Sequence, residues 1–249
     1  MKRDLVVFGE PTLQKALRTV GSLWQARSAT RVNVFVAPTD LSYAQIERGA
    51  RCDLIFALAG ATTETAARAK IIDAGTVRPV LRNSLVLIGP HSGQAVIANA
   101  TLADIVRLIR GNRLAIANPD REPAGARAID LLHDIGFIVD DSNRAVVVAE
   151  SSAGVVNFLA TGKAGLGIVY STDAPPGSVK AFLPTKDQPP IEYVVARARD
   201  PQLDTQPFLE FLKSTAATAA FKAAGLSPIE HDGLWGRGDH SPSQEASSQ

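Results

Sequence analysis

Residues 5–24 read LVVFGEPTLQKALRTVGSLW, and this stretch indicates how the chain folds. Leu5 to Phe8 is an apolar run of strand length, and the apolar positions from Leu13 to Trp24 recur every three or four residues, as in a helix. The alternation continues, with strands expected at 32–36 and 53–58 and helices at 41–49 and 62–72. The order strand, helix, strand, helix, strand predicts a parallel sheet covered by helices on both faces.

The second half of the chain repeats this rhythm. Strands are expected at 84–89, 114–117, 145–148, 166–169 and 191–196, and helices at 102–109, 124–135, 153–161 and 208–223. We therefore expect two α/β lobes, the first formed by residues 1–81 with 176–230 and the second by residues 82–175. Residues 231–249 are rich in Gly, Ser, Asp, Pro and Gln, and we expect this tail to be disordered.

The composition excludes several classes of function. The 249 residues suit two lobes of roughly 100 residues each. The net charge is +1 and the basic residues form no stripe, so no nucleic-acid partner is expected. A lone cysteine, Cys52, excludes a disulfide within the chain and a cysteine-based metal site, and the four histidines lack zinc-ligand spacing. No catalytic triad or P-loop pattern is found, so the chain is not expected to be an enzyme.

The sequence also bears on the compartment. Basic residues at Lys2 and Arg3 precede an apolar run that is too short for a signal peptide, and no apolar run reaches the roughly 20 residues of a membrane span. The chain as given therefore shows no export signal. It stays in the cytoplasm, begins further upstream, or has lost a leader.

Four short stretches are typical of helix starts that follow a strand. They are Glu10-Pro11-Thr12, Pro38-Thr39-Asp40, Glu122-Pro123-Ala124-Gly125 and Glu150-Ser151-Ser152-Ala153-Gly154. A helix start offers unpaired N–H groups and the positive end of the helix dipole, so several that converge can hold a compact anion without Lys or Arg. Each is also explained as an ordinary helix cap, and the sequence alone leaves both interpretations open.

Several motifs resemble one known family. They are Gln45-Ile46-Glu47, Asn83-Ser84-Leu85-Val86, the run RLAIANP at 113–119, Pro123-Ala124-Gly125, and Leu166-Gly167-Ile168-Val169-Tyr170 with Asp173-Ala174. Over about residues 4–229 the chain resembles the substrate-binding proteins of molybdate ABC transporters. This resemblance implies the two-lobed type II periplasmic binding-protein fold, with a ligand cleft between mainly parallel sheets that are flanked by helices.

The resemblance also implies a ligand and a site. The ligand is a tetrahedral oxyanion, molybdate or tungstate, bound without a cofactor and without a metal other than the one inside the oxyanion. The partner is a membrane permease and the compartment is the periplasm. Carried over by position, the hydroxyls fall on Thr12 and Thr39, the amides on Thr12, Thr39, Ala124 and Ser152, and the phenol on Tyr170. Nothing in the sequence indicates oligomerisation, so a monomer is expected.

Two of the four loops depart from the family pattern. The family has Ala-Ala-Ser-Leu where this chain has Glu10-Pro11-Thr12-Leu13, and a serine-rich loop where it has Pro38-Thr39-Asp40. Glu10 and Asp40 bring carboxylates close to an expected dianion, and Arg121 is a candidate counter-charge. These changes leave two alternatives, a different small anion or organic ligand and a cytoplasmic ligand sensor of the same fold.

Overall fold

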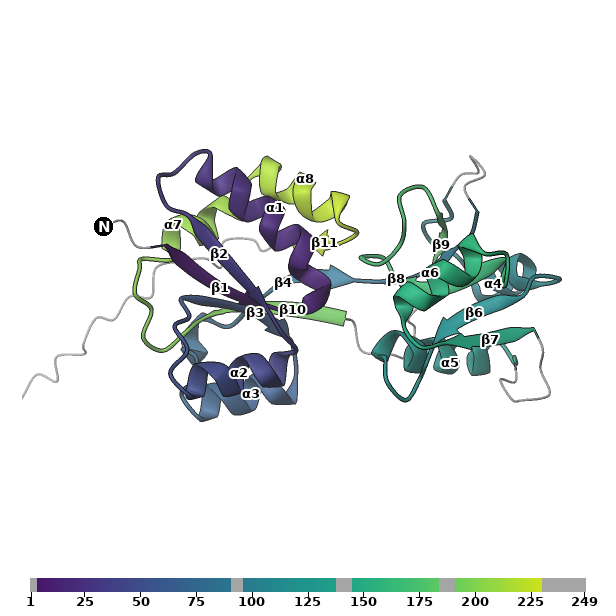
Figure 1. Ribbon diagram of the computed structural model, residues 1–249, viewed down its shortest axis with the longest axis horizontal. Coiled ribbons are helices and arrows are strands. Elements are labelled where there is room, and N and C mark those ends of the chain that lie inside the picture. Colours follow the sequence, from purple (N-terminus) through teal and green to yellow (C-terminus); the bar gives the residue numbers. More distant parts are fainter. Residues whose placement is uncertain (1–3, 91–95, 138–144, 184–190, 230–249) are drawn as a thin grey trace, which may run out of the picture.

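The computed structural model describes residues 4–90, 96–137, 145–183 and 191–229, which form two α/β lobes arranged along the long axis of the molecule (Figure 1). The first lobe contains a six-stranded sheet and the second a five-stranded sheet. The two-lobed α/β fold expected from the sequence is confirmed.

The sheet of the first lobe has the order β11-β4-β10-β3-β1-β2. β1, β2 and β3 are parallel, whereas β10 and β11 run antiparallel to their neighbours. The strands are β1 (Leu5–Gly9), β2 (Val32–Val36), β3 (Leu54–Leu58), β4 (Arg78–Asn83), β10 (Ile191–Arg197) and β11 (Ser227–Pro228). The helical elements are η1 (Pro11–Leu13), α1 (Gln14–Gln25), α2 (Thr39–Glu47), α3 (Ala61–Arg68), η2 (Ala74–Thr76), α7 (Gln206–Phe211) and α8 (Thr215–Ala223).

Helices cover both faces of this sheet, which explains the unbroken apolar run in β1. Leu5 and Val7 join the core beneath α1, α7 and α8, whereas Val6 and Phe8 join the core beneath α2 and α3 (Figure 1). Successive side chains of a strand point to opposite faces, so a strand buried on both faces must be apolar at every position.

The sheet of the second lobe has the order β7-β6-β8-β5-β9. β6, β7 and β8 are parallel, and β5 pairs antiparallel with β8 and β9. The strands are β5 (Leu85–Ile88), β6 (Leu114–Ala117), β7 (Val146–Ala149), β8 (Leu166–Tyr170) and β9 (Val179–Phe182). α6 (Ser152–Ala160) covers one face, and α4 (Leu102–Ile109) and α5 (Pro123–Asp134) supply the core on the other.

The chain passes from the first sheet to the second at Ser84, between β4 and β5. β9 pairs with β5, so the strands of the second sheet extend to Phe182, beyond the boundary at residue 176 that we expected from the sequence. The return to the first sheet falls within 184–190, outside the described residues, as does the tail at 231–249 for which disorder was expected.

The prediction of a single helix over 208–223 is wrong, because the structure has two shorter helices in this region, α7 and α8. The Ser214 hydroxyl accepts a hydrogen bond from the Ala217 amide at 3.2 Å and so begins a new helix within the apolar pattern. β4 and β9 were not expected, since lysine or arginine side chains interrupt their short apolar runs.

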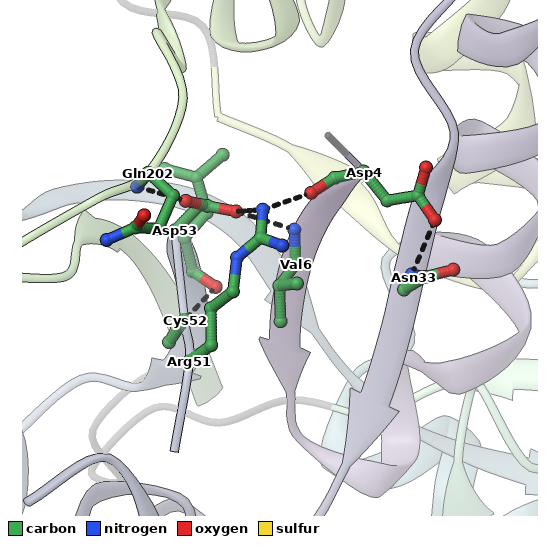
Figure 2. A network of polar contacts seen from close by, with 8 residues as sticks. Asp4, Val6, Asn33, Arg51, Cys52, Asp53 and Gln202 are labelled. Atoms are coloured by element: carbon green, nitrogen blue, oxygen red, sulfur yellow. Dashed lines mark hydrogen bonds and ion pairs between the residues drawn. The ribbon is translucent and has the colours of Figure 1, made fainter. Parts of the chain in front are cut away.

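A buried carboxylate holds β1, β3 and the segment before α7 together at the amino ends of the parallel strands (Figure 2). Asp53 is fully buried and accepts hydrogen bonds from the amides of Val6 at 2.8 Å and Gln202 at 2.6 Å. Arg51 adds an ion pair at 3.4 Å. This cluster therefore stabilises the amino ends of the parallel strands. The predicted site residues extend from the opposite, carboxyl ends.

Within the described part of the chain, no helix has the length and apolar character that a membrane span requires.

Candidate functional site

The predicted site residues lie where parallel strands end. In the first lobe the carboxyl ends of β1, β2 and β3 are directed toward the second lobe (Figure 1). In the second lobe β8 ends at Tyr170, and the adjacent Ser171 hydroxyl donates to Asn83 at the end of β4. Because β6 and β7 run parallel to β8, their carboxyl ends lie on the same edge of that sheet. The four predicted helix starts thus extend from facing edges of the two sheets, the position at which open α/β sheets bind ligands.

Thr39, the first residue of α2, is fully engaged by Glu10. The Glu10 Oε1 atom accepts from the Thr39 amide at 2.6 Å and also from the Thr39 hydroxyl. The same hydroxyl accepts from the Leu58 amide at 3.0 Å. Both side chains are buried, so a carboxylate of the chain itself occupies two donors that the family resemblance assigned to the anion.

The electrostatic environment of Glu10 disfavours its charge. Burial raises the pKa of Glu10 above its ordinary value, the two hydrogen bonds from Thr39 lower it in part, and the neighbouring carboxylate of Asp40 raises it further. The net direction is upward, so protonation of Glu10 is easier than that of an ordinary glutamate.

Thr12 belongs to a hydrogen-bonded chain that leads to the crossover between the lobes. Its hydroxyl lies 2.8 Å from the Tyr193 hydroxyl, which is 3.2 Å from the Asn83 Nδ2 atom. The Asn83 Oδ1 atom accepts from the Ser171 hydroxyl at 2.8 Å and the Ser84 amide at 2.9 Å, which fixes the side-chain amide orientation. Since Nδ2 can only donate, Tyr193 accepts there and can give its own proton to Thr12. The proton of the Thr12 hydroxyl is then available to a ligand.

In the second lobe, Ser152 at the start of α6 lies between two carboxylates. Its hydroxyl donates to Glu122 Oε2 at 3.0 Å and also forms a hydrogen bond with Asp173. Burial raises the pKa of Asp173, the bond from Ser152 lowers it, and the charge of Glu122 raises it. As with Glu10, a carboxylate lies on a residue that was expected to contact the anion.

Tyr170, the last residue of β8, is buried, and its hydroxyl remains protonated. Burial raises the pKa of its phenol to about 12, an effect that Arg127 opposes through its charge and a hydrogen bond. Asp173 and Tyr193 raise this pKa further. A protonated phenol with a cation beside it is a suitable hydrogen-bond donor to an anion.

Ala124 lies in the first turn of α5, where helix N–H groups lack partners inside the helix. The helix approaches the end of β6 very closely, because a Cβ atom on Gly125 would lie 2.3 Å from the Ala117 carbonyl oxygen. Ala124 has no exposed surface in this structure. Contact between its amide and an anion therefore requires the surrounding loop to move.

The two halves of the candidate site influence one another across the lobes. The charge of Glu10 in the first lobe and that of Asp173 in the second both raise the pKa of the Tyr193 phenol, which burial raises most. Arg121, the candidate counter-charge, forms an ion pair with Glu150 at 2.9 Å instead of pairing with Glu10 or Asp40.

Two neighbours of the predicted site had no role in the sequence interpretation. Tyr193 lies in an apolar strand pattern that gave no sign that its hydroxyl would reach Thr12. Glu122 was named only as part of a helix start, and its place directly before Pro123 and α5 brings its carboxylate within reach of Ser152. Asn83 ends β4, next to Ser84, where the chain passes from the first sheet to the second.

Comparison with known proteins places this geometry in a family. The sequence model of the family described as bacterial extracellular solute-binding protein matches residues 5–227. The chain belongs to this family.

Among relatives of this solute-binding protein, the molybdate-binding protein ModA of Escherichia coli (strain K12) is 28% identical over 228 residues, which cover 90% of this chain and 88% of the relative. A solved substrate-binding domain from Clostridium difficile has a TM-score of 0.78 at 22% identity, covering 91% of this chain and 99% of that chain. The tungstate-binding protein TupA from Desulfovibrio alaskensis G20 has a TM-score of 0.61 at 15% identity. The match covers 91% of this chain and 99% of TupA. The solute-binding protein is thus homologous to ModA and has the two-lobed type II periplasmic binding-protein fold.

Proposed function

We propose that this solute-binding protein captures a tetrahedral oxyanion, molybdate or tungstate, between its lobes and delivers it to the membrane permease of an ABC transporter. It performs no chemistry on the ligand, acts in the periplasm and works as a monomer. We expected lobes of residues 1–81 with 176–230 and of residues 82–175, and we now assign the segment up to the end of β9 at Phe182 to the second lobe. Homology to ModA and the structural similarity to TupA support the choice of ligand.

The proposal is supported most directly by the position of neutral donors after the carboxyl ends of strands in both sheets. The proposed ligands are the hydroxyls of Thr12, Thr39 and Tyr170 with the first-turn amides of Thr12, Thr39, Ala124 and Ser152. The hydrogen bond from Asn83 allows Tyr193 to donate to Thr12, and in that arrangement the Thr12 proton can be donated to the anion.

The number of donors suits a tightly bound anion. A hydrogen bond to a charged acceptor contributes about 1.5–3 kcal/mol, so five to seven of them, less the ordering cost of association, are consistent with a dissociation constant below 1 μM, taken as an order of magnitude. Binding is expected to close the lobes about the crossover. Selection of molybdate against sulfate would rest on cavity size, because these two anions share charge and shape but molybdate is larger.

A thermal-shift series with molybdate, tungstate, sulfate and phosphate tests the proposal. A ligand at about a hundred times its dissociation constant stabilises a protein by ~2.7 kcal/mol, which raises Tm by several degrees. We expect a shift with molybdate and tungstate and none with sulfate or phosphate. No shift with any of the four anions would refute the proposed ligand class.

Variants of Thr12 connect that shift to the site. Thr12→Val removes the hydroxyl with little change in shape, and we expect it to weaken molybdate binding about tenfold, whereas Thr12→Ser keeps the affinity near wild type. Thr62→Val, on the exposed surface of α3, is the matched control and should bind like the wild type. Equal affinity in the valine and serine variants of Thr12 would remove this hydroxyl from the site.

The carboxylates beside the proposed site residues favour a second candidate ligand. Glu10, Glu122 and Asp173 each lie on a residue of the proposed site, and an inorganic dianion has no cationic group to pair with them. A small organic ligand that carries a cationic group beside an anionic one would use both the donors and the carboxylates. Thermal shifts with zwitterionic ligands and none with oxyanions would favour this alternative.

A further inference from the structure

We infer that Glu10 is an internal competitor of the anion, so that ligand binding must displace its carboxylate from Thr39 and is accompanied by uptake of a proton. The inference rests on the proposed function. It assigns to Glu10 a role in setting affinity and its pH dependence that follows from the contacts in this chain.

The first step of the argument is the number of donors on Thr39. The Thr39 amide has one proton and the hydroxyl has one, and Glu10 Oε1 accepts both. The hydroxyl also accepts from the Leu58 amide, which holds its oxygen in place while its single proton is donated to Glu10. An oxyanion therefore cannot use Thr39 while Glu10 remains in place.

The second step is the similarity of the two acceptors. A carboxylate oxygen and an oxyanion oxygen both carry negative charge and accept the same kind of charge-assisted hydrogen bond. Glu10 thus satisfies a buried amide and a buried hydroxyl in the ligand-free protein, donors whose desolvation would otherwise be uncompensated. The contact keeps the first-lobe half of the site ordered but lowers the net gain from binding an anion.

The third step concerns the charges around Glu10. Asp40 on α2 raises the pKa of Glu10, and the charge of Glu10 in turn raises the pKa values of Tyr43 on α2 and Tyr193 on β10. Asp173 of the second lobe acts on the same Tyr193 phenol. The groups that these interactions place around Glu10 are acids or neutral phenols, so a bound dianion would raise the pKa of Glu10 further, and proton uptake would relieve the repulsion.

The sign of the pH effect follows by linkage. If the complex holds one more proton than the free protein, the association constant rises tenfold for each unit that the pH falls, within the range between the pKa values of Glu10 in the two states. The expected wild-type affinity for molybdate therefore increases as pH falls through that range.

Isothermal titration of molybdate into the full chain, from pH 6.5 to 8, tests the inference with two variants. Glu10→Ala frees the Thr39 donors, and Glu10→Gln keeps an acceptor of the same shape without the charge. At pH 8 we expect both to bind molybdate at least tenfold more tightly than the wild type, with a pH slope smaller by about one proton. Glu47→Gln, the same charge change at the exposed far end of α2 and about 12 Å along the helix from Thr39, is the matched control and should behave like the wild type.

The outcomes separate this inference from the proposed function. Wild-type binding with no gain and no change of slope in either variant would overturn the role of Glu10 and leave the proposed function standing. If neither the wild type nor the variants bind molybdate or tungstate at any pH, the proposed function fails, and the inference fails with it.

Discussion

Replacing Asp53 with alanine should destabilise the first lobe severely. Asp53 is fully buried and accepts from the amides of Val6 and Gln202 at 2.8 and 2.6 Å (Figure 2). A buried donor left without a partner costs about 1–3 kcal/mol, so two of them cost roughly 2–6 kcal/mol. The ion pair with Arg51 adds little, because the arginine side chain is 40% exposed and can be hydrated when the carboxylate is removed. We therefore expect a loss of about 3–5 kcal/mol, a large part of the 5–15 kcal/mol typical of a folded domain.

Urea unfolding followed by far-ultraviolet circular dichroism measures this loss as a change in the extrapolated free energy of unfolding. Two controls isolate the backbone contacts. Arg51→Ala removes the ion pair and the hydrogen bond from Arg51 to the Asp4 carbonyl, and it should cost less than Asp53→Ala because the carboxylate keeps both amide hydrogen bonds. Asp4→Ala removes the hydrogen bond with Asn33 at 3.1 Å, the one side-chain contact of Asp4 among the described residues, and should cost no more than about 1 kcal/mol. A loss of under about 1 kcal/mol for Asp53→Ala, or an equal loss for Arg51→Ala, would refute the assignment of Asp53 as a clamp on the two amides.

Two further predictions concern the candidate site. Tyr170→Phe removes a donor but keeps the ring, so molybdate affinity measured by titration should fall roughly tenfold. Tyr43→Phe, which removes a hydroxyl bonded to Thr63 at 3.0 Å, should leave affinity unchanged, and equal effects of the two would contradict a ligand role for Tyr170. Asp173 has a raised pKa in the folded protein, so its contribution to stability is complete below its pKa in the unfolded chain and is lost as pH rises through the folded value. Asp173→Asn should therefore flatten the decline in Tm above about pH 4, and superimposable profiles of variant and wild type would rule this out.

Much of the fold followed from local patterns. The apolar runs at 5–8 and 54–58, and the helical periodicity from Leu13 to Trp24, predicted strands and a helix that the structure confirms, since the spacing of apolar residues reflects which faces are buried. The pattern failed over 208–223, where one serine cap divides a continuous apolar periodicity into two helices. A cap depends on a single side-chain hydrogen bond, and apolar spacing does not report that bond.

For the candidate site too, the sequence predicted one part and only the tertiary structure decided the other. The sequence identified which stretches begin helices after parallel strands, because proline, serine and threonine at these positions have strong local preferences. The sequence indicated that the Glu10 carboxylate lies near an expected dianion, but it did not indicate the residue to which Glu10 is hydrogen-bonded. Only the tertiary structure brought Glu10 onto Thr39, 29 residues away, and joined Thr12 to Tyr193 across 181 residues. Strand and helix preferences are set by residues close in the sequence. The hydrogen-bond partner of a buried side chain depends instead on which buried donors the assembled sheets leave unsatisfied. Those donors are fixed only when distant segments of the chain come together.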